Sequence, residues 1–367
     1  MTMEIFGMGT AVPPHELPQD VAAQLAAAVC CENSREQRAL SVLYRNAGIE
    51  RRNVVLSDGI DAPPERENFY SHSAGNSGVP GTRARMAHYE REAPRLAEAA
   101  CAKALASVRC NVSEVTHLII ATCSGFSAPG IDLHLVNALG IPATVRRLQV
   151  GFMGCHAAMN AMMAADGICA ADARNVVLVC AVELCSLHLQ YGWDPARVMA
   201  NALFGDGAAA IVARQSRGDG AHWNLIGDGS RLFPDTGADM SWKIGDHGFE
   251  MFLSQRVPAL IEQHLAEWLL PWLAGRGLTI GDVGCWAVHP GGPRILKAVE
   301  SALTLPAEAL AASWGVLRDC GNMSSPTTLF VLERLTMAGA EGPCVMLGFG
   351  PGLAAEVLLL DRGGPTR

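Results

Sequence analysis

The sequence predicts an α/β fold organised as two related halves. Short runs of aliphatic and β-branched residues alternate with alanine-rich runs, a pattern typical of buried strands joined by crossover helices. The second part of the chain repeats this alternation more briefly. We place the boundary between the halves at about residue 220, so that residues 1–220 form one half and residues 221–367 form the other.

The first half contains four runs that we interpret as strands. They are short and mostly apolar, as expected for strands that are buried on both faces of a sheet. In order they read THLIIATCS, VRRLQV, NVVLVCAVE and GAAAIVAR. A run rich in Ala and Met follows VRRLQV and predicts a helix that starts at about Cys155.

The second half supplies further strand-like runs and two helices. The strands read WNLIGDGS, CWAVHP, PCVMLGFG and LAAEVLLL, and the helices are expected over Phe252–Leu270 and Pro293–Leu303. Ser57–Thr82, in the first half, fits neither pattern, because it is rich in Pro, Gly, Asn and Ser and is too long for a simple connection. Two interpretations stay open for it, a cover over a site and a surface loop.

Composition restricts the class of protein. With 367 residues, of which 50% are hydrophobic, the chain can bury a substantial core. The formal net charge of −8 argues against a general nucleic-acid-binding protein, and no uncharged apolar run is long enough for a membrane span. The amino terminus lacks the pattern of a signal peptide, and the 12 Cys are scattered through apolar runs, which favours reduced thiols. We expect a cytoplasmic enzyme.

Three residues with complementary chemistry stand in separate glycine-containing turns. Cys155 lies in GFMGCHAAM, His289 in WAVHPGGP and Asn322 in CGNMSSP. A thiolate can hold an acyl group, while an imidazole and an amide can hydrogen-bond the enolate that forms when a carboxylated thioester loses CO2. The trio therefore predicts an enzyme that makes carbon–carbon bonds from thioesters.

The position of Cys155 favours a reactive thiol. It is expected at the amino terminus of a helix, where unpaired N–H groups and the helix dipole lower a thiol pKa. The alternative is that Cys155 is one more small buried apolar residue. The presence of His289 and Asn322 favours a catalytic role over this alternative. His156, the next residue, is expected on the buried side of the helix, and a role as a second catalytic histidine is the alternative.

These segments closely resemble the chalcone synthase-like type III polyketide synthases, a branch of the thiolase fold. The matching stretches, in the family's order, are THLIIATCSGFSAPGIDLHLVNALGI, MGC, ALFGDGAAAIV, WAVHPGGPRIL, GNMSSPTTLFVLE and LGFGPGLAAEVLLL. The resemblance implies a layered αβαβα architecture, with the nucleophile in the first half and His and Asn in the second. It also implies a homodimer, coenzyme A thioesters as substrates, and no metal or other cofactor.

The resemblance implies specific roles for the trio. Cys155 takes the starter acyl group from coenzyme A, and His289 maintains its thiolate. His289 and Asn322 stabilise the enolate from malonyl-CoA decarboxylation. Phe204, in LFGDG, matches an aromatic gate between the coenzyme A tunnel and the condensation cavity, where an apolar ring excludes water and favours loss of the malonyl carboxylate.

The sequence departs from plant members of the family at positions that are expected to line the condensation cavity. Met251 replaces a second gating Phe, and Trp242 and His188 stand where smaller residues are usual. We hypothesise few extensions or a narrow starter, with ordinary packing as the alternative role for Trp242. Ala128 replaces a Met that crosses the dimer contact. The cavity-lining set that we predict is Cys123, Ser124, His188, Trp242 and Ser324.

Coenzyme A binding and substrate delivery are less tightly specified. Arg45, Arg51 and Arg52, in LYRNAGIERR, are the candidate contacts to coenzyme A, and the alternative is a solvated surface. The segment NAGIERR resembles ketoacyl synthase III, so delivery by an acyl carrier protein stays open. A ketoacyl synthase III-like enzyme that makes a single condensation is the main alternative function. A papain-like protease and a non-catalytic acyl-CoA-binding protein are disfavoured by the motif context and by the complete trio.

Overall fold

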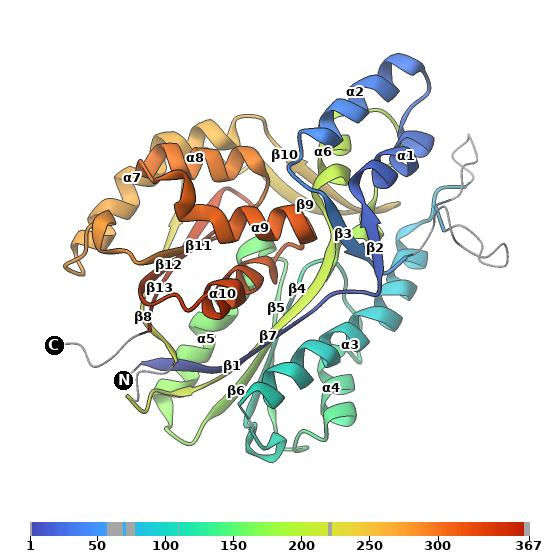
Figure 1. Ribbon diagram of the computed structural model, residues 1–367. Helices are drawn as coiled ribbons and strands as arrows, with labels where there is room; N and C mark the ends of the chain where they lie inside the picture. Colours follow the sequence, from blue (N-terminus) through green and yellow to red (C-terminus); the bar gives the residue numbers. More distant parts are fainter. Residues whose placement is uncertain (1, 57–68, 71–77, 109, 219–221, 363–367) are drawn as a thin grey trace.

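The chain is represented by a computed structural model that describes residues 2–56, 69–70, 78–108, 110–218 and 222–362. Most of the predicted loop Ser57–Thr82 lies outside the described residues. Figure 1 shows strands in the middle of the molecule with helices packed on both sides. The α/β class predicted from the sequence is confirmed.

The main sheet has nine strands among the described residues. Their order is β11-β12-β13-β8-β1-β7-β6-β4-β5, and the two halves meet where β1 pairs with β8 over three residues. The bounds are β1 Met3–Ala11, β4 His117–Thr122, β5 Arg146–Gly151, β6 Val176–Leu184, β7 Asp206–Gln215, β8 Trp223–Leu232, β11 Cys285–Val288, β12 Gly342–Gly350 and β13 Ala354–Arg362.

The two halves of the sheet share one topology. In the first half β4 is parallel to β6, and β6, β7 and β1 follow as antiparallel neighbours. In the second half β11 is parallel to β12, and β12, β13 and β8 follow in the same relation. The related halves expected from the sequence are therefore seen in the strand order, whereas their boundary near residue 220 stays a prediction.

Successive side chains of a strand point into apolar layers on opposite faces of the sheet. Three helical layers, with the strands of the two halves between them, make up the five-layer architecture. In β4, Ile119 and Ala121 face a central layer, and Leu118 and Ile120 face an outer one. The central layer holds α5 (Ala157–Ala171) and α10 (Thr327–Met337), one from each half. The outer layers hold α3 (Thr82–Ser107) and α4 (Ile131–Leu139) on one side, and α7 (Val257–Ala274) and α8 (Pro293–Leu303) on the other.

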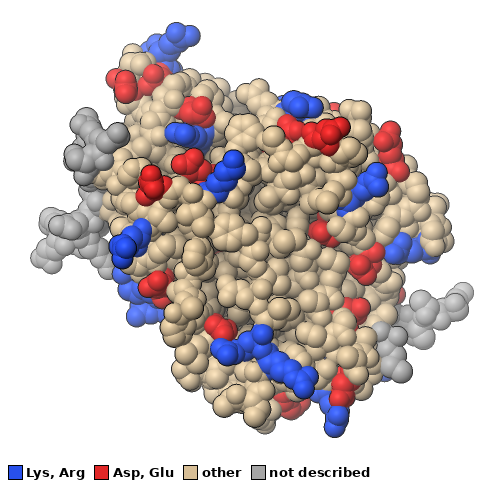
Figure 2. Space-filling model, turned by 180° about the vertical axis from the view of Figure 1, so that it is seen from behind, with Lys and Arg blue, Asp and Glu red and all other residues tan. Residues whose placement is uncertain are grey.

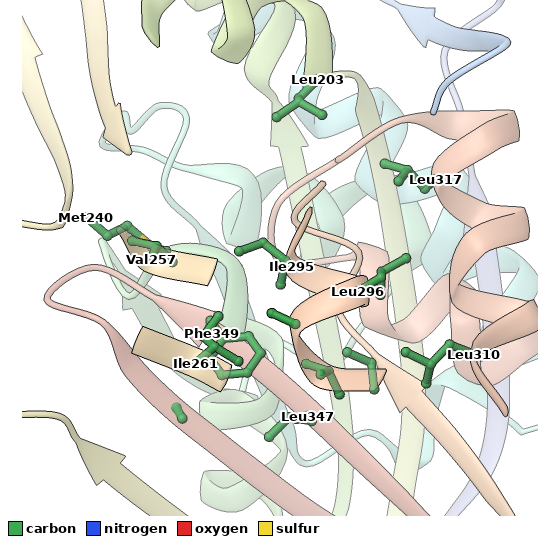
Figure 3. Close-up of a cluster of buried hydrophobic side chains, with 14 of the residues drawn as sticks. Leu203, Met240, Val257, Ile261, Ile295, Leu296, Leu310, Leu317, Leu347 and Phe349 are labelled. Atoms are coloured by element: carbon green, nitrogen blue, oxygen red, sulfur yellow. The ribbon is translucent and has the colours of Figure 1, made fainter. Parts of the chain in front are cut away.

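The outer layer of the second half also anchors the segments that surround the site. Figure 3 shows Leu203, Met240, Ile295 and Phe349 converging on one buried cluster from different elements. Removing this apolar surface from water stabilises the fold by about 25 cal/mol per Å2. The remaining helices are α1 (Gln19–Cys30), α2 (Ser34–Arg45), α6 (Pro195–Leu203) and α9 (Ala311–Cys320).

Two small antiparallel sheets were not predicted from the sequence. One pairs β2 (His15–Pro18) with β3 (Arg51–Val54), which α1 and α2 separate in the chain, and the other is the hairpin of β9 (Met240–Gly245) with β10 (Gly248–Leu253). This hairpin corrects the predicted helix over Phe252–Leu270. Phe252 and Leu253 belong to β10, and α7 begins only at Val257. Pro258, in the first turn, suits this start because proline lacks the N–H that is unpaired there.

Among the described residues, no helix combines the length and the apolar character needed to cross a membrane. Figure 2 shows acidic and basic side chains interspersed on one face, apart from a short row of basic groups near its lower edge. The surface in this view therefore lacks the extended basic area that a nucleic-acid-binding protein uses.

Candidate active site

The three predicted catalytic residues lie on one cavity of about 590 Å3. Cys155 follows β5, His289 follows β11, and Asn322 follows α9. The carboxyl ends of parallel strands are where α/β proteins assemble their sites, because the connecting loops gather there. The loops bring a thiol, an imidazole and an amide from both halves of the chain to the same wall.

The turn before Cys155 depends on glycine. Gly154 has a φ of +72°, and a Cβ atom added there would lie 2.3 Å from Cδ of Pro351. Only glycine adopts this backbone and tolerates this contact at little cost. The MGC and GFGPG motifs are therefore packed against each other. Cys155 lies in a single 3-10 turn, Gly154–His156, that leads directly into α5.

Burial controls the ionisation of Cys155. The thiol is buried, and burial raises its pKa from 9.0 to about 11. Hydrogen bonds with the side chains of Ser324 and Asn322 lower this pKa, but by less than burial raises it. The prediction that the helix terminus depresses this pKa is wrong for the unliganded chain. Desolvation of the thiolate outweighs the favourable partners. At neutral pH Cys155 is therefore a thiol.

His289 is a neutral imidazole in a desolvated setting. Its side chain is 2% exposed, and burial lowers its pKa from 6.5 to about 3. Neither ring nitrogen has a hydrogen-bond partner among the described residues, although the backbone N–H donates to the carbonyl of Leu347 at 2.8 Å. Buried polar atoms are almost always paired, so two free nitrogens on a cavity wall indicate a group that a ligand or substrate satisfies.

Asn322 is held with its amide carbonyl already used. Its Oδ1 accepts a hydrogen bond from the backbone N–H of Ser324 at 2.8 Å, and its Nδ2 donates one to the carbonyl of Gly291 at 3.4 Å. An amide nitrogen carries two N–H donors, so one is left for a ligand. The backbone of Asn322 is paired with the end of α6, where its N–H donates to Leu203 and its carbonyl accepts from Gly205. This pairing ties the amide donor to the segment that carries Phe204.

Phe204 and Met251 are the two residues predicted to form a gate. Both line the 590 Å3 cavity, a void of about 10 Å3 next to Cys155, and a second cavity of about 430 Å3. Met251 lies opposite Trp242 in the β9–β10 hairpin, so the two side chains share one face. The predicted gating positions are thus common to all three spaces.

The predicted cavity-lining residues divide into three groups. Cys123, Trp242 and Ser324 line the small void beside Cys155. His188 and Trp242 line the second cavity. Ser124 lies on none of the three cavities, because its fully buried hydroxyl donates a hydrogen bond to Glu183 at 2.6 Å. Ser124 is therefore a wall support, which corrects its prediction as a lining residue.

Trp242 combines the two roles that the sequence left open. Its Nε1 donates a hydrogen bond to the carbonyl of Cys123 at 2.7 Å, and its ring meets those of His188 and Phe249 edge-on at 5.4 and 5.8 Å. His188 is itself fixed, since Nε2 donates to Ser124 O at 2.6 Å and Nδ1 accepts from Phe249 N–H at 2.9 Å. Trp242 is both a packed anchor and a wall of the small void.

Sequence reasoning missed Glu183. It is fully buried at the end of β6, burial raises its pKa, and it accepts hydrogen bonds from the hydroxyls of Ser124 and Ser325 and the thiol of Cys123. A buried carboxylate with this many donors ties the turn after β4 to the turn that carries Asn322. An acidic residue inside the apolar run NVVLVCAVELC was the signal that could have found it.

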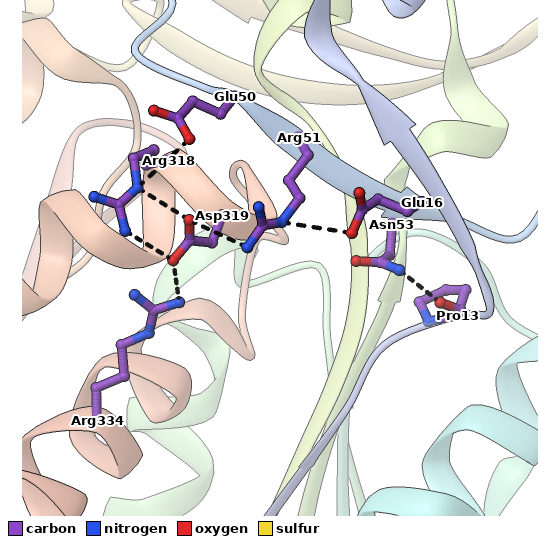
Figure 4. A network of polar contacts seen from close by, with 8 residues as sticks. All are labelled: Pro13, Glu16, Glu50, Arg51, Asn53, Arg318, Asp319 and Arg334. Carbon is purple, nitrogen blue, oxygen red and sulfur yellow. Dashed lines mark hydrogen bonds and ion pairs between the residues drawn. The ribbon is translucent and has the colours of Figure 1, made fainter.

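The predicted contacts to coenzyme A do not lie on the cavity that holds Cys155. Arg51 is part of an ion-pair network with Glu16 and Asp319, which Figure 4 shows. Arg52 is buried and its guanidinium donates hydrogen bonds to the backbone of α6, while Arg45 is exposed at the end of α2. The cations that line this cavity are Arg294 and Lys297 of α8.

His156 lies behind the nucleophile and on none of the three cavities. It is 2% exposed, and its Nδ1 lies 2.7 Å from Oδ1 of Asn160. Gly350 leaves room for its ring, because a Cβ atom there would lie 2.4 Å from the imidazole. The buried position predicted for this side chain agrees with the structure, and nothing places it against a substrate.

Comparisons with known proteins agree with this geometry. The family model for the N-terminal domain of chalcone and stilbene synthases matches residues 2–216, and the model for the C-terminal domain matches residues 225–362. A 1,3,6,8-tetrahydroxynaphthalene synthase of Streptomyces peucetius subsp. caesius is 33% identical, over 97% of this chain and 92% of that protein. An alpha-pyrone synthesis polyketide synthase-like protein of Mycobacterium tuberculosis is 32% identical, over 97% of this chain and 90% of its own.

Solved structures support the same assignment. PKS-I from the brown alga Ectocarpus siliculosus superposes with a TM-score of 0.92 at 28% identity and covers 98% of both chains. The type III polyketide synthase domain of Steely1 from Dictyostelium shares the fold, with a TM-score of 0.89 at 23% identity over 99% of this chain and all of that domain. The thiolase-like αβαβα fold is confirmed. The chain belongs to the chalcone and stilbene synthase family.

Proposed function

We propose that the protein is a type III polyketide synthase that loads an acyl starter on Cys155 and extends it with malonyl-CoA. The observation that carries this proposal is the meeting of Cys155, His289 and Asn322 on one cavity in a chain of the chalcone and stilbene synthase family. The reaction needs no cofactor beyond the coenzyme A thioesters themselves. A single-condensation enzyme of the ketoacyl synthase III type is not favoured, because the named relatives are polyketide synthases.

Loading is an acyl transfer from one sulfur to another. The Cys155 sulfur attacks the thioester carbonyl while its proton passes to the free imidazole of His289. The tetrahedral oxyanion collapses, the bond to the coenzyme A sulfur breaks, and that thiolate takes the proton from His289. Because both groups are buried and neutral at rest, the charge forms only when the substrate is present.

Extension begins with decarboxylation of malonyl-CoA. The carbon–carbon bond to the carboxylate breaks, CO2 leaves, and the electron pair moves into an enolate of the remaining thioester. N–H groups of Asn322 and of His289 donate hydrogen bonds to the enolate oxygen. The enolate carbon then attacks the acyl group on Cys155, and the Cys155 thiolate is the leaving group. The product is a coenzyme A thioester longer by two carbons.

We propose Arg294 and Lys297 as the contacts to the phosphates of coenzyme A. Both lie on α8, which begins at Pro293, and both line the cavity that holds Cys155. Arginine and lysine bind phosphate through charge-assisted hydrogen bonds. Arg294→Ala with Lys297→Ala should raise the KM for malonyl-CoA at least tenfold with a smaller change in kcat. Arg45→Ala, exposed on α2, is the matched control, and a larger effect there would restore the sequence-based prediction.

We propose a homodimer that covers the β5 edge of the sheet. β5 is the last strand, and Leu148, Phe152 and Phe126 nearby are 45%, 40% and 51% exposed. An exposed strand edge with apolar side chains is a ready pairing surface. Leu148→Lys should shift the mass in sedimentation from dimer to monomer. A monomeric wild-type chain would end this proposal, and an acyl carrier protein as a partner gains no support from the geometry.

A cytoplasmic location is proposed from the state of the thiols. All 12 Cys are unpaired, and nine of them are buried. Free thiols persist in reducing compartments, whereas secreted chains usually form disulfides. Fractionation of the source cells with an antibody should place the protein in the cytosolic fraction, and recovery from the culture medium or the membrane pellet would overturn the proposal.

Few extensions are proposed from the size of the space beside the nucleophile. The void shared by Cys155, Trp242 and Ser324 measures only about 10 Å3. Trp242→Gly removes the ring that fills this region, so products should lengthen by one or more two-carbon units when analysed by mass spectrometry. Phe252→Ala, on the opposite face of the hairpin, is the matched control. If the product length is unchanged in Trp242→Gly, the Trp242 side chain does not limit the number of extensions.

The experiment that tests the function is product analysis of the purified enzyme. It is incubated with malonyl-CoA and a panel of aliphatic and aromatic acyl-CoA starters, with Cys155→Ala as the control. We expect Cys155-dependent pyrones or phenolic products, in line with the relatives named for naphthalene and alpha-pyrone products. A single 3-ketoacyl product, or activity only with an acyl carrier protein, would replace the proposal by the ketoacyl synthase III type.

A further inference from the structure

Three cysteines, Cys123, Cys155 and Cys185, line the void of about 10 Å3 next to the catalytic wall. This volume is enough for about one water-sized group. Cys155 also lines the 590 Å3 catalytic cavity, whereas Cys123 lies on the void alone of the three spaces. Cys155 therefore borders both a cavity that small solutes enter and a small space that holds a second thiol.

Cys123 and Cys155 are held close together by the fold. Cys123 directly follows β4 and Cys155 lies in the turn after β5, and these parallel strands are paired as far as Thr122 and Gly151. Paired strands are about 4.8 Å apart. The Ser324 hydroxyl lies 3.5 Å from Cys123 Sγ and is also hydrogen-bonded to the Cys155 thiol, so one oxygen atom spans the two sulfurs. The void leaves room for either thiol to rotate about χ1 towards the other.

Cys123 has a proton acceptor beside it. Its thiol donates a hydrogen bond to Oε1 of Glu183 at 3.3 Å. Burial raises the pKa of Glu183, which makes the carboxylate a stronger base. A thiol attacks another sulfur only as the thiolate, so an adjacent base activates it. Cys185 borders the same void, but within the described part of the chain its thiol is hydrogen-bonded to neither Ser324 nor Glu183.

We infer that Cys123 is a resolving thiol for Cys155, so that oxidation of Cys155 by a hydroperoxide ends in a disulfide between these two residues. Hydrogen peroxide reaches Cys155 through the catalytic cavity. The sulfur attacks one peroxide oxygen, the O–O bond breaks, and the departing hydroxide takes the thiol proton and leaves as water. Cys155 is then a sulfenic acid.

The second step forms the disulfide. The Cys123 sulfur attacks the sulfenic sulfur of Cys155 while its proton passes to Glu183. The sulfenic hydroxyl takes up a proton and leaves as water, and Glu183 returns its proton to the solvent. In sum, two thiols are oxidised to one disulfide and one peroxide is reduced to two molecules of water.

The disulfide keeps the oxidation of Cys155 reversible. A sulfenic acid without a neighbouring thiol is oxidised further to a sulfinic acid, which dithiols do not reduce, whereas a disulfide is reopened by thiol exchange. Transient disulfides of this kind are the usual ones in reducing compartments, in agreement with the proposed cytoplasmic location. The inference goes beyond the proposed function and does not depend on it.

Peptide mapping after oxidation tests the inference without any substrate. Because burial raises the pKa of Cys155 to about 11, little thiolate is present at neutral pH, and the purified full chain is therefore incubated with excess hydrogen peroxide. Remaining thiols are alkylated, and a non-reduced digest is analysed by mass spectrometry. We expect peptides linked through Cys123 and Cys155, and a loss of about two mass units from the intact chain for the two hydrogens removed. Dithiothreitol should restore the original mass.

Two variants separate Cys123 from the neighbouring thiol. Cys123→Ser keeps a hydroxyl beside Glu183 but cannot form the disulfide. Its Cys155 should proceed to the sulfinic acid, a gain of about 32 mass units that dithiothreitol does not remove. Cys185→Ala, on the same void, is the matched control and should give the same linked peptides as wild type. Thermal unfolding of the untreated variants shows that both are folded.

Four results would overturn the inference. Oxygen added to Cys155 in the wild-type chain without a linked peptide would show that no thiol resolves it. A link from Cys155 to Cys185 would assign the role to the other thiol. Full recovery of Cys123→Ser by dithiothreitol would show that Cys123 is not needed. Lack of oxidation at peroxide levels that oxidise the urea-unfolded chain would show that the oxidant does not reach Cys155.

The proposed function is tested separately from this inference. A lack of Cys155-dependent products in reducing buffer contradicts the polyketide synthase proposal and leaves the disulfide untouched. Conversely, a chain that makes products but yields no linked peptide retains the proposed function and lacks the resolving thiol.

Discussion

Gly350, in the GFGPG motif at the end of β12, is predicted to be intolerant of alanine for a steric reason. A Cβ atom there would lie 2.4 Å from Cδ2 and Nε2 of His156 and 2.9 Å from the carbonyl oxygen of Met153. Both distances are far shorter than a van der Waals contact. The substitution thus presses on the residue that directly follows Cys155.

The expected loss of stability follows from how little the His156 side chain can move. Its ring is 2% exposed and its Nδ1 lies 2.7 Å from the side-chain oxygen of Asn160, so the imidazole has no free space to enter. Overpacking of this kind costs about 1–3 kcal/mol of stability. A displacement of the nucleophile by about 1 Å can cost on the order of a hundredfold in rate. We therefore expect Gly350→Ala to lower both the urea midpoint and kcat.

A double-mutant cycle measures the steric contact directly. Gly350→Ala, His156→Ala and the double variant are compared by urea unfolding and by turnover of malonyl-CoA with one starter. Truncation of His156 opens space for the new methyl group, so the double variant should recover at least half of the stability lost in Gly350→Ala. Gly167→Ala, in the middle of α5 with nothing within 4 Å, is the matched control and should stabilise the helix by about 1 kcal/mol.

Either of two results would contradict the steric prediction. A Gly350→Ala variant as stable and as active as wild type would show that the neighbouring atoms move at no cost. Equal losses in the single and the double variant would show that His156 is not what the added methyl group meets.

Two further predictions concern buried charges near the gate. Arg52→Met removes guanidinium hydrogen bonds of 2.9 and 2.7 Å to the carbonyls of Asn201 and Phe204, and should lower the unfolding free energy by about 3–5 kcal/mol in urea titrations. A loss below about 1 kcal/mol would show that solvent replaces the guanidinium. Burial raises the pKa of Asp206 from 3.8 to about 6, so the folded chain binds this proton more tightly than the unfolded chain does. The resulting stabilisation is fully present below pH 3.8 and is lost as the pH rises through 6, a change of about 3 kcal/mol. Asp206→Asn should flatten urea midpoints measured between pH 4 and pH 7, and an unchanged slope would contradict the assignment.

The structure brings the three predicted catalytic residues to one cavity, and each could be found because its sequence signal is local. Cys155, His289 and Asn322 each stand in a short glycine-containing turn. The first two follow strands, and the loops that connect parallel strands gather at the carboxyl ends of those strands. The predicted strands and the helix Pro293–Leu303 have clear periodicity, and the structure contains them. The catalytic roles of the trio stay predictions until the variants are measured.

The predictions for Arg52 and for the pKa of Cys155 were wrong because both depend on how much solvent reaches the side chain. Arg52 was predicted as a contact to coenzyme A, with a solvated surface as the alternative, yet it is buried and donates hydrogen bonds to the carbonyls of Asn201 and Phe204 at the end of α6. Helix position suggested a depressed pKa for Cys155, whereas burial, which no local pattern reveals, raises it. The β9–β10 hairpin was hidden by a weak pattern, and it is the element that places Trp242 opposite Met251.

By itself the sequence determined the α/β class, eight of the nine strands of the main sheet and the three candidate catalytic groups, because hydrophobic periodicity and glycine-bearing turns are encoded within short windows of the chain. Only the tertiary structure decided which cations face the catalytic cavity, how the thiol ionises, and that a 430 Å3 apolar space lies beyond Phe204 and Met251. These properties depend on desolvation and on the space left between elements far apart in the chain. Neither quantity is carried by any single segment.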